Sequence, residues 1–180
     1  MKYREVSEIS DGMRIDWDIP IKLEDGTVLR ADVYRPIEEG AYPVILTHGP
    51  YGKWLRFEDT YADQWRIMCE SHPEVPAGST NKYQNWETVD PEKWVPDGYA
   101  VVRIDSRGAG RSEGVMDIWS RQEALDQYEC IEWAAEQPWS TGKIGLNGIS
   151  YYAMNQWQTA EFQPPHLTAM CAWEGSTDYY

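Results

Sequence analysis

One serine stands in a setting that suits nucleophilic chemistry. Ser150 follows the strand-like run 143–147 through Gly148-Ile-Ser150-Tyr-Tyr152, and a helix-like stretch begins at once. A strand, a tight turn and a helix lift a serine hydroxyl clear of a sheet, at a helix N-terminus that favours negative charge. The alternative is a serine that merely caps the helix. The second glycine usual in such a turn is Tyr152 here, and the nearest small residue is Ala153.

Two further motifs lie at the ends of apolar runs. The segment LTHGPYGKW, residues 46–54, ends the first run, and VVRIDSRGAGRSEG, residues 101–114, ends the second at Asp105. A dinucleotide-binding loop requires G-x-G-x-x-G at the opening of a helix. The second motif has G-x-G-x-x-x-G instead, and its helix pattern starts only near Ser120. We therefore expect a structural turn here and no nucleotide site.

The elements that must position these motifs begin with a hairpin. Residues 13–23 and 27–36 are two alternating runs joined by Glu24-Asp25-Gly26. Alternation around Asp-Gly is a strong hairpin signal. The pattern predicts two antiparallel strands at the start of the fold.

The remaining elements alternate between strands and helices. Helix patterns cover 120–138, which opens with the capping box Ser120-x-x-Glu123, and 151–162, which ends before two prolines. Short, nearly continuous apolar runs fit strands buried on both faces of a parallel sheet; they are 42–49, 98–105, 142–148 and 167–175. The alternation predicts an α/β sheet preceded by the antiparallel hairpin.

The segment 53–96 interrupts this alternation. It is rich in Trp, Asp and Glu, and we expect an insertion with short helices of its own. Two interpretations of its tryptophans stay open: they line a cleft, or they anchor the insertion. The residues concerned are Trp54, Trp65, Trp86 and Trp94.

Composition bounds the class of protein. With 180 residues the chain is long enough for one domain with a core. A net charge of −14 argues against binding to nucleic acid or to anionic membrane surfaces. Ten Trp and twelve Tyr suit half-wet surfaces such as cleft walls, although an aromatic-rich core accounts for them almost as well.

Cysteine usage and the N-terminus predict a cytoplasmic protein. Cys69, Cys130 and Cys171 are far apart and odd in number, which is typical of reduced thiols. The N-terminus has no apolar core of a signal peptide, and no run of eighteen apolar residues occurs. The three histidines are scattered, so we expect no metal site and no cofactor. The oligomeric state is left open.

Four motifs taken in order resemble those of the X-Pro dipeptidyl-peptidase/cocaine esterase (CocE/NonD) family of serine hydrolases: HGPYGK, DSRGAGRSEG, GISYYA and PPHLTAMCAWEGSTDYY. The resemblance covers essentially the whole chain. It implies an α/β-hydrolase fold, here its N-terminal portion, with an antiparallel hairpin leading into a mostly parallel sheet with flanking helices. We expect residues 1–180 to be part of a longer catalytic domain, without the cap and the C-terminal β-sandwich domain.

The resemblance also implies roles for individual residues. Ser150 would be the nucleophile that attacks an ester or amide carbonyl. Tyr51 would donate its phenol hydroxyl, and Tyr151 its backbone N–H, to the oxyanion. Preorganised donors of this kind stabilise the tetrahedral intermediate by roughly 3–4 kcal/mol each. Asp105 and Arg107 would be structural, forming a turn and ion pairs that support the elbow.

The acid and the base are expected beyond residue 180. In α/β-hydrolases the order is nucleophile, then acid, then histidine, and only 30 residues follow Ser150. His166 is predicted to lie in a loop at the opposite edge of the sheet. His48 stands in the wrong order, and His72 lies in the insertion. Asp178 follows the last strand, where some hydrolases place the acid.

The leading hypothesis is a serine hydrolase that cleaves an ester or amide acyl bond, with this chain alone at best weakly active. Small esters or acylated amines are favoured as substrates over short peptides with a penultimate proline, which an X-Pro dipeptidyl aminopeptidase would take. An inactive fragment or a non-catalytic binding protein is the alternative. A Trp-lined sugar-binding module would require the aromatic residues on one β-sandwich face, and they are scattered over an α/β pattern.

Overall fold

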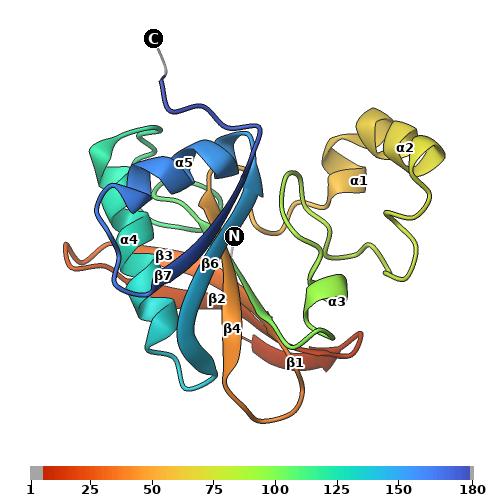
Figure 1. Cartoon of the computed structure of the whole chain (residues 1–180), viewed down its shortest axis with the longest axis horizontal. Coiled ribbons are helices and arrows are strands. Elements are labelled where there is room, and N and C mark those ends of the chain that lie inside the picture. The colour runs from red at the N-terminus through yellow and green to blue at the C-terminus, as the bar shows by residue number, and fades with distance from the viewer. Residues whose placement is uncertain (1–5, 179–180) are drawn as a thin grey trace.

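The computed structural model describes residues 6–178. These residues form one seven-stranded sheet in the order β1-β2-β3-β5-β4-β6-β7 with helices on both faces (Figure 1). The strands are β1 (Val6–Ser10), β2 (Met13–Lys22), β3 (Val28–Arg35), β4 (Tyr42–Gly49), β5 (Ala100–Asp105), β6 (Ser140–Ile149) and β7 (Leu167–Trp173). The helices are α1 (Phe57–Thr60), α2 (Ala62–Ser71), α3 (Pro91–Trp94), α4 (Arg121–Ala135) and α5 (Tyr151–Ala160).

The predicted hairpin is formed by β2 and β3, which pair antiparallel. Its turn is closed by hydrogen bonds of 2.9 Å from the Leu23 N–H to the Thr27 carbonyl and from the Gly26 N–H to the Leu23 carbonyl. Strand β1, which the sequence analysis did not predict, pairs antiparallel with β2 at one edge of the sheet. On its other side β3 pairs antiparallel with β5, so the hairpin is joined directly to the central strands.

The four apolar runs form the parallel part of the sheet, as predicted. Strands β5, β4, β6 and β7 lie side by side and every neighbouring pair is parallel. All six residues of β5 are buried, because both of its faces are covered. Strand β7 lies at the second edge of the sheet.

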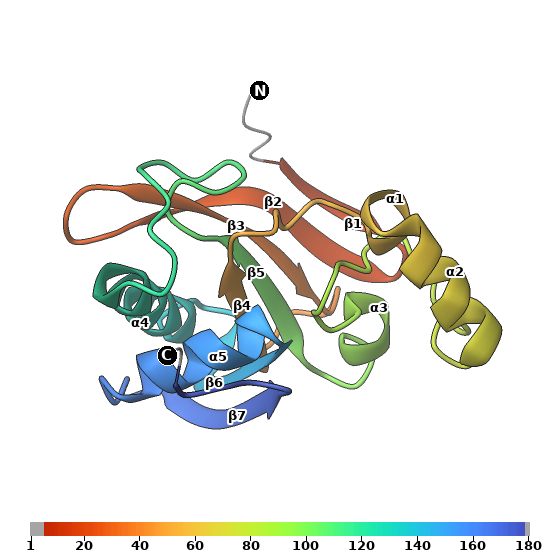
Figure 2. The same ribbon diagram turned by 90° about the horizontal axis from the view of Figure 1, so that it is seen from above.

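Two apolar clusters cover opposite faces of this sheet. Helices α4 and α5 lie on one face, where Cys130, Ile131 and Ala134 of α4 join the central cluster with residues of β3–β6. On the other face Val89 and Val95 pack with residues of β2–β5. Figure 2 shows α3 on the side of the sheet opposite to α4 and α5. The layered arrangement is that of an α/β fold.

The start of α4 carries the predicted capping interactions. The Ser120 hydroxyl accepts a hydrogen bond of 3.1 Å from the Glu123 N–H. The Glu123 carboxylate reaches back one residue further than usual and accepts the Trp119 N–H at 2.9 Å. Trp119 has a positive φ of 59°. The helix entry is therefore fixed by two reciprocal contacts.

The segment 53–96 contains the three short helices α1, α2 and α3 and extends beside the sheet (Figure 1). The two ends of the segment lie side by side where the chain leaves the body of the protein and returns to it. The Phe57 N–H donates to the Gln84 carbonyl at 2.8 Å, and Arg56 and Asn85 form an isolated antiparallel bridge. The long excursion thus leaves the body of the protein and returns to it at nearly the same place.

Candidate active site

The backbone of Ser150 is not that of an ordinary helix cap. It connects β6 directly to α5 with φ 54° and ψ −110°. This combination lies outside the regions that L-residues ordinarily occupy, and such strain is typical of functional sites. The Ser150 side chain makes no capping hydrogen bond, and the residue is only partly buried. Its hydroxyl is therefore not used to cap α5.

The missing second glycine of the turn is compensated by a glycine about one hundred residues away. A Cβ added at Gly49 would lie 2.4 Å from Cε1 of Tyr152, so the Tyr152 ring occupies the space beside Gly49. A Cβ added at Gly148 would lie 2.2 Å from the Tyr152 Cβ. Both glycines are thus required by the tyrosine. The tight turn is therefore kept although Tyr152 stands where a second glycine is usual.

The turn is held in place from two sides. The Ser150 N–H donates to the Trp173 carbonyl at the end of β7 at 3.0 Å. The preceding Ile149 N–H donates to the Glu87 carbonyl at 3.2 Å. Glu87 itself has a positive φ of 61°. One attachment comes from the neighbouring strand and the other from the segment 53–96, so that both fix the position of Ser150.

The loop after β4 carries Tyr51 toward the same end of the sheet. Its backbone is anchored by Asp105 at the end of β5, whose carboxylate accepts the Lys53 N–H at 2.7 Å and the Arg111 N–H at 3.0 Å. Burial raises the pKa of Asp105, and these two N–H bonds oppose that effect. At Gly110 a Cβ would lie 2.2 Å from Asp105 Oδ2. The glycine therefore makes room for the carboxylate that fixes the loop.

Lys53 anchors this loop a second time through its side chain. Its Nζ lies 2.5 Å from Asp18 Oδ1 and 2.8 Å from Asp32 Oδ1, and all three side chains are buried. Arg111 also contacts Asp18. A buried ion pair is strongly destabilising when one partner is removed. This network ties the loop to the β2–β3 hairpin.

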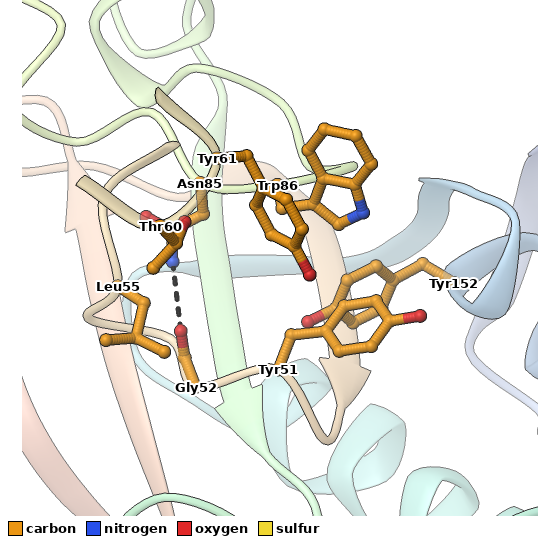
Figure 3. A pocket seen from close by; sticks show the side chains of 8 residues that line it. All are labelled: Tyr51, Gly52, Leu55, Thr60, Tyr61, Asn85, Trp86 and Tyr152. Carbon is orange, nitrogen blue, oxygen red and sulfur yellow. Dashed lines mark hydrogen bonds between the residues drawn. The ribbon is translucent and has the colours of Figure 1, made fainter. Parts of the chain in front are cut away.

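A cavity of about 260 Å³ opens beside Tyr51 and Tyr152. Figure 3 shows the two tyrosine rings on one side and Tyr61 and Trp86 on the other. The Tyr61 and Trp86 rings stack at 4.2 Å, and the Tyr51 and Tyr152 rings meet edge to face at 5.4 Å. The lining is completed by Gly52, Leu55, Thr60 and Asn85. None of the eight lining residues carries a formal charge, so the cavity suits an uncharged group.

The two residues expected to supply the oxyanion donors, Tyr51 and Tyr151, contact each other through their rings. The Tyr51 and Tyr151 rings meet edge to face at 5.8 Å. Burial, followed by the charge of Glu87, raises the pKa of Tyr51, so its phenol stays protonated and remains a donor at neutral pH. Tyr151 is the first residue of α5, and within residues 6–178 its backbone N–H has no hydrogen-bond partner.

The tryptophans of segment 53–96 divide between the two interpretations. Trp86 lines the cavity at Tyr51, and Trp54 lines a second hollow on the other side of the loop. Trp65 packs edge to face on Phe57 at 5.3 Å, and Trp94 packs in the same way on Tyr99. The first two line hollows, and the other two pack on neighbouring aromatic rings and anchor the segment.

None of the three histidines is hydrogen-bonded to Ser150 in the described part of the chain. His48 is fully buried, and burial lowers its pKa to about 4, so its ring is neutral. His166 lies at the start of β7, at the opposite end of the parallel strands from Ser150, and pairs with Glu132 at 2.7 Å. His72 is exposed after α2.

The glycine-rich segment 105–114 forms a turn and not a helix start. Its glycines have positive φ, and α4 begins only at Arg121. Arg107 forms a bidentate pair with Asp126, both contacts being 2.8 Å, and a further pair with Asp25. This arrangement joins the turn to α4 and to the hairpin. After β7, the Ser176 hydroxyl donates to the Asp178 carbonyl and accepts from the Asp178 N–H.

Three residues of the site were missed in the sequence analysis. Asn85 joins the Tyr51 loop to the sheet: its Nδ2 donates to the Lys53 carbonyl at 2.6 Å, and its Oδ1 accepts from Arg103 at 2.9 Å. Glu87 holds the backbone before Ser150, and Glu123 contacts Tyr151. Each is an ordinary polar residue in sequence, and only the Ser120-x-x-Glu123 spacing gave any signal.

The match to a family model decides the relationship of the chain. Residues 25–180 match the model described as X-Pro dipeptidyl-peptidase (S15 family). The chain belongs to this family. The matched range contains Tyr51, Ser150 and every loop that surrounds them.

Known relatives of the family support the same assignment. Cocaine esterase from Rhodococcus sp. (strain MB1 Bresler) is 33% identical over 163 residues, which are 91% of this chain and 24% of the relative. A solved CocE/NonD family hydrolase from Staphylococcus aureus has a TM-score of 0.79 at 40% identity, covering 93% of this chain and 29% of that one. The chain thus spans about a quarter of the length of these relatives.

A more distant structure confirms the fold alone. An aminopeptidase from a marine sediment archaeon, Thaumarchaeota archaeon, has a TM-score of 0.69 at 18% identity, over 99% of this chain and 28% of that chain. The expected α/β-hydrolase fold is therefore confirmed. Over residues 6–178, no helix has the length and apolarity to cross a bilayer, and no three His, Cys, Asp or Glu residues are grouped as metal ligands.

Proposed function

We propose that this chain carries the nucleophile and the oxyanion hole of a serine hydrolase that cleaves ester or amide acyl bonds through an acyl-enzyme. One observation carries the proposal: Ser150 stands at the strand-to-helix junction with φ 54° and ψ −110° and makes no capping hydrogen bond. A serine that only capped the helix would have an extended backbone and a bonded hydroxyl. Membership in the family supports the same chemistry.

The proposed reaction has two steps. Ser150 Oγ attacks the carbonyl carbon and its proton passes to a histidine, which returns the proton to the departing alcohol or amine as that bond breaks. Water then hydrolyses the acyl-serine by the same route. The described residues bring no histidine to Ser150, and we propose that the acid and the base lie beyond residue 180.

In both steps negative charge develops on the carbonyl oxygen. We assign its stabilisation to the Tyr51 hydroxyl and the Tyr151 backbone N–H. The raised pKa of Tyr51 keeps the phenol a donor, and the Asp105–Lys53 contact fixes the loop that carries it. Removing one donor of this kind costs roughly a hundredfold to a thousandfold in rate.

The cavity beside Tyr51 favours small esters or acylated amines as substrates. Its aromatic and aliphatic lining offers apolar contact for an acyl group, and no charged side chain lines it. An X-Pro dipeptidyl-peptidase would bind a peptide with a free ammonium group, which needs a carboxylate. That activity is the alternative within the family, and it would require a carboxylate outside this cavity.

Covalent labelling tests the proposal. The 180-residue chain, alone and extended to the length of its relatives, is treated with a fluorophosphonate probe beside the variants Ser150→Ala and Ser79→Ala. We expect the extended protein and its Ser79→Ala variant to react and its Ser150→Ala variant not to react. Reaction of neither wild-type form would refute the hydrolase and leave a non-catalytic binding protein. That alternative is favoured by the lack of a histidine bonded to Ser150 among the described residues.

A further inference from the structure

A buried carboxylate contacts the side chain of Tyr151, one of the two residues of the proposed oxyanion hole. Glu123, in the first turn of α4, is only 5% exposed. Glutamate is almost never fully buried unless it is paired. No ion pair of Glu123 with a basic side chain occurs within residues 6–178, so its partners must be neutral donors.

Those partners are the residue after the nucleophile and the turn before α4. The Tyr151 hydroxyl lies 2.6 Å from both carboxylate oxygens of Glu123. The Trp119 N–H donates to Glu123 Oε2 at 2.9 Å. The Trp119 ring lies on the Tyr151 ring with a centroid distance of 3.9 Å. The side chain of Tyr151 is thus fixed at its hydroxyl and along one face.

Fixing this side chain fixes the backbone to which it belongs. Tyr151 is the first helical residue, so its N–H points out of the helix beside Ser150. Its ring also packs on the Tyr51 ring, at a centroid distance of 5.8 Å and an interplanar angle of 60°. A change in the Tyr151 side chain would therefore shift both proposed donors, its own backbone N–H and the Tyr51 hydroxyl.

We propose that Glu123 is a positioning residue of the oxyanion hole, which holds Tyr151 through its hydroxyl and thereby aims the Tyr151 N–H at the oxyanion. This inference rests on the proposed function, because it assumes that Ser150 is acylated. Glu123 does not touch substrate, and its effect is transmitted by Tyr151 and Trp119.

A carboxylate suits this task because it accepts both donors at once. Burial raises the pKa of Glu123, while the bonds from Tyr151 and Trp119 lower it. The pKa of Tyr151 is raised by burial and then by Glu123, so the phenol stays protonated and continues to donate. Glutamine at position 123 would keep one acceptor and the shape, whereas alanine would lose both contacts.

The competing explanation is that Glu123 only caps α4. Under that explanation, removing Glu123 lowers stability and leaves the chemistry of the folded protein unchanged. Glu129 provides the matched control, because it lies on the same helix and accepts a backbone N–H, that of Glu24, at 2.7 Å. Among the described residues, its hydrogen bond is to the β2–β3 turn and not to α5.

The test uses the protein extended to the length of its relatives, with the fluorophosphonate labelling rate and the hydrolysis of p-nitrophenyl acetate as readouts. We expect Glu123→Ala and Tyr151→Phe each to lower the labelling rate and kcat about tenfold at unchanged KM. Because both act through one contact, the double variant should fall no further. Glu123→Gln should recover most of the rate, and Glu129→Ala should match the wild type.

The outcomes separate the two proposals. Wild-type labelling with Glu123→Ala and Tyr151→Phe both at the wild-type rate would overturn the role of Glu123 alone. Fully additive losses in the double variant would also overturn it. A wild-type protein that is never labelled would overturn the proposed function, and this inference with it. If Glu123→Ala does not fold, Tyr151→Phe decides the question, since it removes only one hydroxyl.

Discussion

Because the backbone of Ser150 is strained, we predict that glycine at this position is more stable than alanine, which reverses the usual order. Glycine in a strand or helix is normally less stable than alanine by about 0.5–1 kcal/mol, because its unfolded chain is more flexible. At φ 54° and ψ −110°, however, a residue with a Cβ carries a strain of about 1–3 kcal/mol that glycine avoids. The difference leaves Ser150→Gly more stable than Ser150→Ala by about 1 kcal/mol.

Urea unfolding at neutral pH measures this difference. Both substitutions delete the same hydroxyl, so any contribution of that group cancels in the comparison. With a slope near 2 kcal/mol/M, the midpoint of Ser150→Gly should lie roughly 0.5 M above that of Ser150→Ala. Ser7, the exposed second residue of β1, is the control site, where alanine should be the more stable by about 0.5–1 kcal/mol. An alanine variant at 150 as stable as the glycine variant would mean that the turn is unstrained, and the argument for a nucleophile turn would fail.

Three further predictions concern the supports of the site, all measured by urea unfolding. Gly110→Ala should cost about 3 kcal/mol, since its Cβ would lie 2.2 Å from a carboxylate, whereas Gly78→Ala, also at positive φ but with open space around it, should cost about 1. Lys53→Met should cost about 3–5 kcal/mol because it removes the cation beside the buried Asp32 and one of the cations at Asp18, and Lys82→Met, in an exposed pair, at most about 1; equal costs would contradict the buried network. Burial raises the pKa of Asp32 above 3.8, so the native state binds a proton at this carboxylate more tightly than the unfolded chain does. Protonation of Asp32 therefore stabilises the fold fully below pH 3.8, and this contribution to the free energy of unfolding is lost as the pH rises through the native pKa. Asp32→Asn should therefore flatten the fall in stability with rising pH, and an unchanged slope would contradict the assigned shift.

The elements with a strong local pattern were predictable from the sequence. Strands β2 to β7 and helices α4 and α5 have apolar periodicity and clear boundary residues, and each was found close to its predicted range. Strand β1 was missed because it is a short edge strand: its only large apolar residues, Val6 and Ile9, are both exposed and give no alternating buried pattern. The place of β5 between β3 and β4 was also not predicted, because strand order depends on packing between distant segments.

The residues of the candidate site likewise divide into those that local sequence predicts and those that it does not. Ser150, Tyr51 and Tyr151 stand in motifs that can be recognised locally, and the structure brings the latter two into ring contact. The role of Tyr152 was not predictable, because the residue that accommodates it, Gly49, lies in another motif. The role of Asn85, and the contact of Glu123 with Tyr151, were not predicted for the same physical reason. Their significance comes from partners more than twenty-five residues away along the chain.

The closed base of segment 53–96 has a consequence for how substrate range can change in such a protein. Because Asn85 ties the returning chain to the carbonyls of Gly52 and Lys53, the residues between 58 and 83 form a loop whose ends are already fixed. Thr60 and Tyr61 in that loop line the cavity, whereas the turn at Ser150 lies outside it. Doubling the length of a flexible loop costs only about 0.6 kcal/mol in closure entropy. We therefore expect that the loop can be replaced as a unit, and that the lining of the cavity can change, while the position of Ser150 stays the same.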